Sequence, residues 1–204
     1  MFKNKYPGKF IAIEGIDGSG STTQSDMICR ELKADKKSCF LTQEPTNYII
    51  GNILRGYLSG EFKTDNQTYL QLLFAADRAA HLEHEIIPRL KKGINVLTDR
   101  YFLSSLAYGS LDIDDTDWLY QINNQFLLPD LTILIKVPIK VALKRIKDER
   151  TGIEMFEKEA SLSKVWNAYE TLSQKYPNIK IVDGEKDVYE IHKQIEPMIN
   201  RIIK

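Results

Sequence analysis

The sequence predicts an α/β fold in which a five-stranded parallel sheet is flanked by helices on both faces. Short apolar runs alternate along the chain with longer segments of helical periodicity. The apolar runs are nearly continuous, which is typical of strands that are covered on both faces. No internal repeat, low-complexity tract or linker interrupts this order. We therefore expect residues 1–204 to form a single domain.

Five apolar runs predict the strands, and the longer periodic segments predict the helices between them. The first run, "KFIAIEG", stops at glycines, and a helical pattern begins at Ser21. The helical segment after the third run contains "LDIDDTD", whose aspartates indicate a loop and a helix N-cap. The predicted strands are residues 9–15, 38–43, 94–100, 131–137 and 179–184. The predicted helices are residues 21–34, 49–59, 66–90, 103–128, 140–149, 157–176 and 188–203.

The charge balance and the composition argue against nucleic acid and membranes as binding partners. Lys plus Arg and Asp plus Glu number 28 each, so the net charge is zero and no global basic field favours nucleic acid. No apolar run approaches the ~20 residues that span a bilayer, and the first residues, "MFKNKYPGK", lack the apolar core of a signal peptide. Cys29 and Cys39 match no metal motif and are interpreted as reduced thiols. We therefore expect a cytoplasmic protein that binds neither nucleic acid nor membrane.

Polar residues stand where the predicted strands end. In a parallel sheet, ligands bind beyond the carboxyl ends of the strands. These positions should converge on one edge of the sheet, and six of the seven are charged. They are Glu14, Gln43, Glu44, Asp99, Arg100, Lys136 and Asp183.

A glycine loop, "GIDGSGSTTQ", joins the first strand to the first helix. It fits the phosphate-binding pattern G-x-x-x-x-G-K-[ST] at Gly15, Gly20 and Thr22, but Ser21 stands in place of the lysine. Backbone N–H groups in such a loop form an anion nest, the helix start adds its dipole, and the Thr22 hydroxyl can ligate magnesium. The alternative is a plain turn rich in glycine and serine. The candidate phosphate-binding residues are Gly15, Asp17, Gly18, Ser19, Gly20, Ser21, Thr22 and Thr23.

"TDRYFLSSLAY" and "LLFAADRAAH" carry the other candidate site residues. An acid next to a base at a strand end is typical of a site that handles phosphate and magnesium together, with Asp99 for the metal's water shell and Arg100 for a bidentate phosphate contact. Phe74 and Arg78 share a helix face, so one can stack on a nucleobase while the other reaches its carbonyl edge. The alternative is a core phenylalanine and a surface arginine. "HLEHE", on the same helix, fits no zinc signature and is interpreted as a solvated helix face.

Taken in order, these motifs resemble those of the thymidylate kinase family of P-loop nucleoside monophosphate kinases. The matching stretches span residues 10–195 and are "FIAIEGIDGSGSTTQ", "QEPTNYIIG", "LLFAADRAAH", "DRYFLSSLAY", "PDLTILIKVP" and "VDGEKDVYEIHKQI". The resemblance implies a three-layer P-loop NTPase fold with a closable lid. It implies transfer of a phosphoryl group from ATP to dTMP with Mg²⁺, giving ADP and dTDP. It also implies a homodimer.

The resemblance further implies a role for each site residue. Asp17 would approach the sugar 3′-hydroxyl and help to place the monophosphate. Phe74 would stack on thymine and Arg78 would hydrogen-bond to it. Arg100 would bind the acceptor phosphate, and Asp99 would assist the metal through water. The remaining acceptor-site residues would be Glu44, Arg55, Ser104, Ser105 and Tyr108.

The candidate lid is "KRIKDERTGIEMFEK", residues 144–158. Gly18 stands where one family subtype carries a catalytic arginine, so the resemblance implies that Arg145 and Arg150 of the lid supply this charge. An arginine that enters on closure can neutralise charge on the transferred phosphoryl group. The alternative is the solvated end of an amphipathic helix.

Four positions depart from the family pattern. Ser21 replaces the lysine of the P-loop, Gln43 an arginine, Gly109 a glutamine and Lys136 an aspartate. One charge about 4 Å from a phosphate oxygen contributes roughly 4 kcal/mol at an effective dielectric near 20, so an active enzyme needs a substitute. We hypothesise that Lys136, which ends a strand expected beside the loop, supplies this catalytic cation. The alternative is that Lys136 reaches solvent or pairs with a carboxylate.

These departures leave two other functions open. The first is a kinase with another nucleotide or a nucleoside as acceptor, since Gln43 and Gly109 differ from the residues that the family usually has at these positions of the acceptor site. The second is a nucleotide-binding sensor with little catalysis, since Ser21 lacks the P-loop charge. Against a sensor stand the retained acidic and basic site residues and the lid arginines, which a binding-only module does not need.

Overall fold

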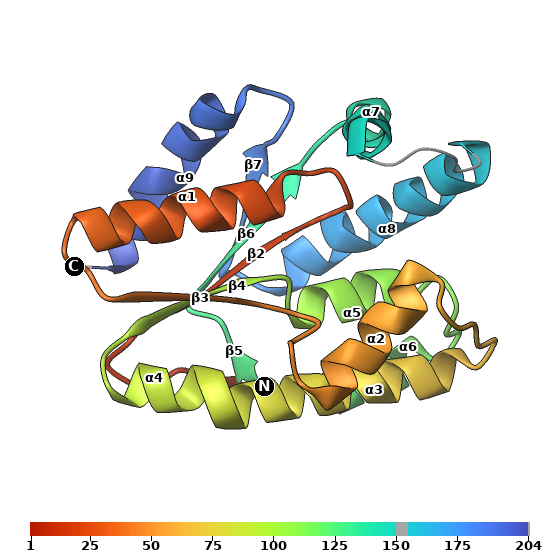
Figure 1. Cartoon of the computed structure of the whole chain (residues 1–204), viewed down its shortest axis with the longest axis horizontal. Helices are drawn as coiled ribbons and strands as arrows, with labels where there is room; N and C mark the ends of the chain where they lie inside the picture. The colour runs from red at the N-terminus through yellow and green to blue at the C-terminus, as the bar shows by residue number, and fades with distance from the viewer. Residues whose placement is uncertain (150–154, 204) are drawn as a thin grey trace.

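The central sheet has five parallel strands in the order β3–β4–β2–β6–β7 (Figure 1). The structure is a computed structural model that describes residues 1–149 and 155–203. The strands are β2 (Phe10–Gly15), β3 (Cys39–Gln43), β4 (Asn95–Asp99), β6 (Leu131–Lys136) and β7 (Ile179–Asp183). Each lies inside a range that the sequence predicts, so the predicted parallel sheet is confirmed.

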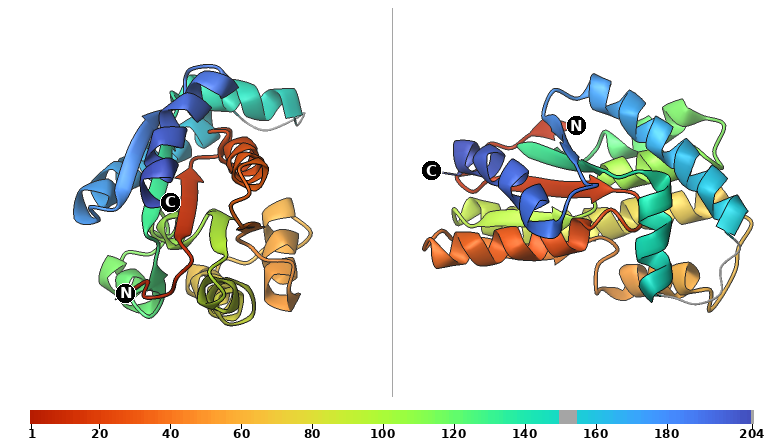
Figure 2. Two further views of the ribbon diagram at one scale, coloured as in Figure 1. Left: turned by 90° about the vertical axis from the view of Figure 1, so that its left-hand side faces the viewer. Right: turned by 90° about the horizontal axis from the view of Figure 1, so that it is seen from above.

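Helices cover both faces of the sheet and give three layers. They are α1 (Ser21–Ala34), α2 (Ile49–Ser59), α3 (Gln67–His81), η1 (Leu82–Ile86), α4 (Ile87–Lys91), α5 (Phe102–Gly109), α6 (Thr116–Asn123), α7 (Ile139–Glu149), α8 (Met155–Lys175) and α9 (Val188–Ile202). Side chains alternate between the faces of a strand. Ile11 and Ile13 of β2 pack with α1 and α9, whereas Phe10 and Ala12 pack with η1, α4, α5 and α8. Figure 1 shows α1 and α9 above the strands and α3 and α4 below, and Figure 2 shows the strands between them.

Two predicted helices differ in detail from the structure. The segment predicted over residues 66–90 is continuous, but it passes from α3 through the π-helical turn η1 into α4. The segment predicted over residues 103–128 is interrupted by the aspartate-rich loop, where Asp115 accepts a hydrogen bond of 2.9 Å from the Trp118 N–H and starts α6. The helical prediction is wrong at its end, because β5 (Leu127–Leu128) pairs with β1 (Phe2–Lys3) in a small second sheet. Strands this short carry no periodicity to detect.

The carboxyl ends of the strands meet at one edge of the sheet, as predicted. Asp99 is in register with Ile13 on one side and Gln43 on the other. Backbone hydrogen bonds continue past the strand ends, from the Glu44 N–H to the Asp99 carbonyl at 3.0 Å and from the Arg100 N–H to the Ile13 carbonyl at 2.9 Å. The ends of β6 and β7 join the same edge. The glycine loop after β2 therefore lies among the predicted polar residues.

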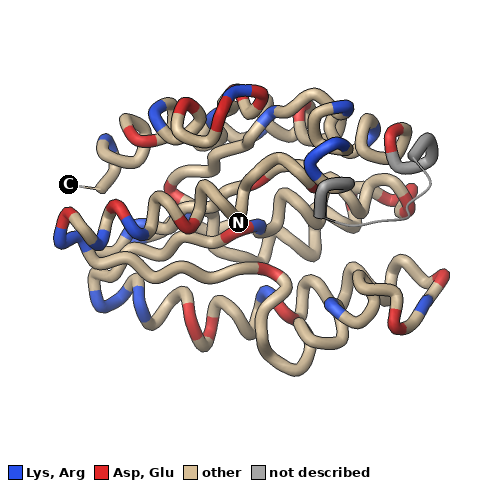
Figure 3. The backbone as a smooth tube through the Cα atoms, turned by 45° about the horizontal axis from the view of Figure 1, so that its top comes forward, with Lys and Arg blue, Asp and Glu red and all other residues tan. Residues whose placement is uncertain are grey.

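Charged residues of both signs are mixed along the helices in the view of Figure 3. Cys29 and Cys39 are buried and form no disulfide. Within the described residues, no helix combines the length and the apolarity that crossing a bilayer requires.

Candidate active site

The glycine loop turns sharply between β2 and α1. Gly18 and Gly20 have φ angles of 78° and 90°, a region that residues with a side chain rarely adopt. A Cβ on Gly18 would also lie 2.5 Å from the Ala142 carbonyl oxygen. Gly20 is the N-cap of α1 and has no side chain to accept from the first-turn N–H groups. These groups are therefore available to an anion such as phosphate.

Thr22 and Asp99, the two residues predicted to serve a metal, are in direct contact. The Thr22 hydroxyl donates a hydrogen bond of 2.5 Å to Asp99 Oδ2. Asp99 Oδ1 is buried and has no partner among the described residues. A hydroxyl beside a carboxylate with a free oxygen is the donor set that Mg²⁺ prefers. These residues fit a magnesium ion, directly or through its water shell.

Arg100 joins the glycine loop to α5. Its Nη2 lies 2.6 Å from Asp17 Oδ1, and its Nη1 donates to the Gly15 carbonyl at 3.2 Å and to Ser104 Oγ at 3.3 Å. The Asp17 N–H donates to the Tyr108 hydroxyl at 3.2 Å. A guanidinium held beside the loop in this way can bind a second phosphate close to one bound by the loop.

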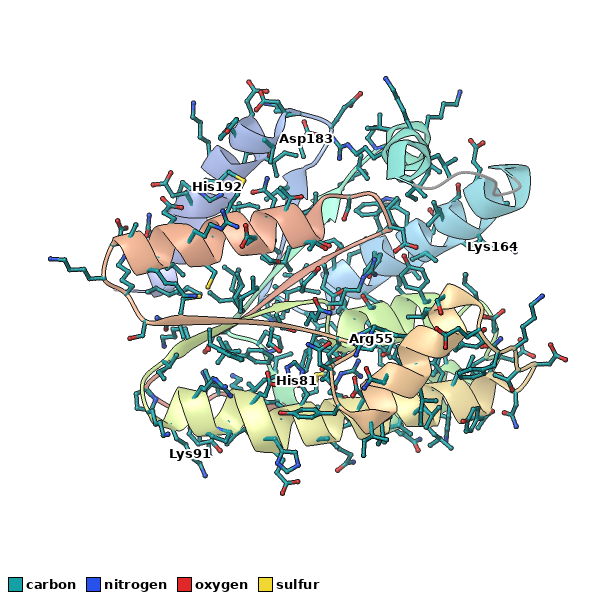
Figure 4. The ribbon with its side chains drawn as sticks, in the orientation of Figure 1. Arg55, His81, Lys91, Lys164, Asp183 and His192 are labelled. Atoms are coloured by element: carbon teal, nitrogen blue, oxygen red, sulfur yellow. The ribbon has the colours of Figure 1, made fainter. Side chains whose placement is uncertain are left out.

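A cavity of about 350 Å³ opens next to Arg100. Most of the predicted acceptor-site residues line it. They are Asp17, Glu44, Phe74, Arg78, Arg100, Ser104, Ser105 and Tyr108. Arg55, labelled in Figure 4, is not among the lining residues and instead donates to the Pro45 carbonyl at 2.9 Å. Gln43 is exposed at the sheet edge and does not line the cavity either.

Arg78 is buried, which rules out the surface arginine of the alternative interpretation. Only 1% of it is exposed, and its Nε and Nη2 contact Glu44 Oε2 at 2.9 and 2.8 Å. Nη2 also donates to Ser105 Oγ at 2.8 Å, and Nη1 donates to Asn123 Oδ1. Phe74 is half-buried and lines the same cavity. A buried guanidinium with this many acceptors is held in one orientation.

The prediction of a solvated helix face is wrong for His81, although Glu83 and His84 of the same stretch are exposed. His81 is fully buried between α3 and β3, with Nδ1 3.0 Å from Glu44 Oε1 and Nε2 2.8 Å from Thr42 Oγ1 (Figure 4). His81 therefore supports the carboxylate that holds Arg78. Like Asn123, it was missed as a site residue because its partners are distant in sequence. Within the described residues, no group of three or more His, Cys, Asp and Glu side chains is arranged to hold a metal ion.

Glu14 is a buried acid directly before the glycine loop. Its carboxyl group accepts from the Tyr101 N–H at 2.9 Å, from Ser104 Oγ at 2.5 Å and from the Tyr169 hydroxyl at 3.2 Å. Burial raises the pKa of Glu14 to about 7, although its hydrogen bonds and the charge of Arg100 oppose this shift. The sequence singles out Glu14 only as a strand-end residue. The structure makes it the link between β2, α5 and α8.

Besides Arg100, two cations among the described residues are candidates for the missing P-loop charge, Lys136 at the end of β6 and Arg145 on α7. Lys136 Nζ lies 2.7 Å from Glu170 Oε1 and 5.1 Å from the ring centroid of Trp166, so it has the carboxylate partner of the alternative interpretation. Arg145 Nη1 donates to the Gly18 and Ser19 carbonyls, each at 3.4 Å. Of Lys136 and Arg145, Arg145 is the one that hydrogen-bonds to the loop.

The rest of the predicted lid is only partly described. Arg145 Nη2 donates to the Gly184 carbonyl at 3.0 Å, which ties α7 to the loop after β7. Arg150, the other predicted lid arginine, lies outside the described residues.

Comparison with known proteins identifies the family to which this site belongs. The sequence model of the thymidylate kinase family matches residues 13–195. A probable thymidylate kinase of Methanocaldococcus jannaschii is 42% identical over 91% of this chain and 93% of its own length, and one of Pyrococcus horikoshii is 39% identical over 94% and 96%. A thymidylate kinase of Thermosipho africanus is 34% identical over 94% of this chain and 98% of its own. The match covers the glycine loop, the cavity and the predicted lid, and the chain belongs to the thymidylate kinase family.

Proposed function

We propose that this chain transfers the γ-phosphate of ATP to dTMP, giving ADP and dTDP. Membership of the thymidylate kinase family supports the reaction. The observation that carries the proposal is the contact between Arg100 and Asp17, because it joins the glycine loop to the cavity. A donor phosphate on the loop and an acceptor phosphate in the cavity would then be neighbours, which is what direct phosphoryl transfer requires.

The acceptor would lie along the cavity with its phosphate toward Arg100. Phe74 would face the plane of the base, and Arg78 would donate to a ring carbonyl. Asp17 would approach the sugar 3′-hydroxyl beside Tyr108. An oxygen of the acceptor phosphate would attack the γ-phosphorus while the bond to ADP breaks, so the protein's contribution is positioning and charge neutralisation.

Thr22 and Asp99 would hold magnesium. Asp99 Oδ1 is buried without a partner among the described residues, and the Thr22 hydroxyl is adjacent to the same carboxylate. The ion supplies positive charge to the donor phosphates when it is bound. The two side chains would orient these phosphates with respect to the N terminus of α1.

Two described cations are candidates for the charge that Ser21 does not supply. Lys136 would have to exchange Glu170 for a phosphate oxygen, whereas Arg145 already lies against the loop. Arg150 would add a charge from the lid when the lid closes.

The function is tested by supplying purified protein with Mg·ATP and, separately, dTMP, dUMP, dCMP and thymidine. We expect ADP and dTDP to form in equal amounts and dTMP to give the highest kcat/KM. Arg100→Met should abolish turnover, and Arg30→Met is a matched control because its side chain is 79% exposed on α1. A higher kcat/KM for an acceptor other than dTMP would mean that the protein is a kinase for that acceptor. ATP binding without turnover of any acceptor would favour a sensor.

We further propose that the protein is a homodimer. Six of the nine large exposed apolar side chains among the described residues lie on α2, on α3 or between these helices. The six are Ile49, Ile53, Leu58, Phe62, Tyr69 and Leu72. An exposed cluster of this kind is typical of an interaction surface. Light scattering should give twice the mass of the chain for the wild type and the single mass for Ile49→Asp combined with Leu72→Asp. Tyr189→Asp, which is exposed on α9, should remain dimeric.

A further inference from the structure

Gln71 is a buried amide in the cavity wall, and its side chain hydrogen-bonds to no other described residue. It lies on α3 three residues before Phe74 and seven before Arg78, a spacing that places all three on one helix face. Only 6% of Gln71 is exposed, and it lines the cavity with the other two residues. Its Oε1 is shielded from solvent and accepts no hydrogen bond from the described residues. A buried carbonyl without a hydrogen-bond donor lowers the stability of the folded protein by about 1–3 kcal/mol. Such a group in a cavity wall therefore calls for an explanation, such as a ligand that donates to it.

Gly109 of α5 makes room for this amide. A Cβ on Gly109 would lie 2.9 Å from Gln71 Cδ, 3.0 Å from Oε1 and 3.1 Å from Nε2. The end of the Gln71 side chain therefore lies against the bare Cα of Gly109. Any side chain at position 109 would displace it.

We propose that Gln71 is a specificity-determining residue whose amide hydrogen-bonds to the edge of the acceptor base. The amide itself occupies the space that the missing side chain of Gly109 leaves. This inference rests on the proposed function and adds to it a contact to the base. A carboxamide carries one acceptor and two donors, and it can rotate to present either to a ligand. A pyrimidine-2,4-dione offers a complementary edge, with an N–H beside a carbonyl. The amide would accept from the ring N–H and donate to the carbonyl.

Arg78 determines which ring edge fits. A guanidinium carries donors only, so it favours a ring carbonyl and disfavours an amino group. Glu44, Ser105 and Asn123 hold it in place. Gln71 and Arg78 together would therefore recognise thymine or uracil rather than cytosine.

The first test is Gln71→Leu, which keeps the size of the side chain and removes its hydrogen bonds. We expect the KM for dTMP to rise about ten-fold, with kcat and the KM for ATP within about two-fold of the wild type. That factor corresponds to about 1.4 kcal/mol, the value of one hydrogen bond. The free energy of unfolding without ligand should not fall, because the variant removes an unpaired buried amide. A Gln71 that only fills space would give an unchanged KM for dTMP.

The second test is Gly109→Ala. Its added methyl group displaces the Gln71 amide, but the amide itself is still present. Gly109 is the last residue of α5 and its φ lies outside the left-handed region, so the backbone there accepts alanine and the variant should fold. The KM for dTMP should rise here as well, and Gly109→Ala should add nothing in a Gln71→Ala background. If the wild-type protein phosphorylates dTMP and both Gln71→Leu and Gly109→Ala keep its KM for dTMP, the inference about Gln71 is wrong and the proposed function still stands. A wild type that turns over no dTMP overturns the proposed function and, with it, this role of Gln71.

Discussion

Thr22 at the start of α1 donates a hydrogen bond of 2.5 Å to Asp99 at the end of β4. The two residues are far apart in sequence and come together because β2, which leads into the glycine loop, pairs with β4. The contact brings a hydroxyl and a carboxylate to the first turn of a helix whose N–H groups favour anions. A cation and a phosphate therefore have neighbouring positions at this helix start.

Thr22→Ala is expected to lower kcat about 10- to 100-fold, because it removes an oxygen ligand and a hydrogen bond to a charged group. Thr22→Ser keeps the hydroxyl and should keep most of the activity. Steady-state assays at increasing Mg²⁺ should show that Thr22→Ala needs more magnesium for half-maximal rate. An unchanged magnesium requirement would argue against a metal role for Thr22.

Charge-removing variants separate the two candidates for the missing P-loop cation. Because the Arg145 guanidinium already lies against the glycine loop, we expect the larger loss of kcat/KM for ATP in Arg145→Ala. The Lys136 hypothesis instead predicts a fall in kcat of up to about three decades in Lys136→Ala. Glu170→Gln is the matched control, since it releases the Lys136 ammonium and should not lower kcat under either hypothesis. Lys136→Ala within three-fold of the wild type would refute the role of Lys136.

Breaking the buried pair of Glu44 and Arg78 should cost far more stability than breaking an exposed pair. Glu44→Ala leaves the Arg78 guanidinium buried without its carboxylate, and we expect a loss of about 3–5 kcal/mol in the free energy of unfolding. The matched control is Asp26→Ala, which breaks the exposed pair with Arg30 and should cost less than about 1 kcal/mol. Urea denaturation of the three proteins gives these differences. Equal losses in the two variants would mean that Arg78 finds another partner.

Much of the fold and of the phosphate-binding loop could be predicted because their signals are local. The apolar runs indicate strands on their own, and Gly15, Gly20 and Thr22 lie within one short stretch. The convergence of Glu44, Asp99 and the loop follows from parallel topology alone.

The network around Arg78 could not be predicted in the same way. Asn123 lies 45 residues from Arg78 in sequence, and no spacing rule connects them. His81 stands in a charged stretch typical of a solvated face, but it is buried in the structure and contacts Thr42 and Glu44 at the end of β3. Lys136 shows the converse case, because the sequence places it at the correct sheet edge but does not indicate Glu170 as its partner. Side-chain partners depend on which helices pack together, and a single sequence does not record this.

The stability of the protein should depend on pH through Glu14. Burial raises the pKa of this carboxyl group from 4.5 to about 7 in the folded chain. Between these values the folded state holds a proton that the unfolded state has released, so the contribution of Glu14 to stability is greatest below pH 4.5 and is lost as the pH rises through 7. The total change over this window is about 3 kcal/mol.

Glu14→Gln keeps the shape of the side chain and removes its titration. The difference in unfolding free energy between the wild type and Glu14→Gln, measured by urea denaturation from pH 4.5 to pH 8, should therefore shift by about 3 kcal/mol in favour of the variant. The matched control is Glu185→Gln at an exposed position, whose profile should run parallel to that of the wild type. If Glu14→Gln also runs parallel to the wild type, the pKa of Glu14 is the same in the folded and unfolded states, and its hydrogen bonds from Ser104 and Tyr169 offset the cost of burial.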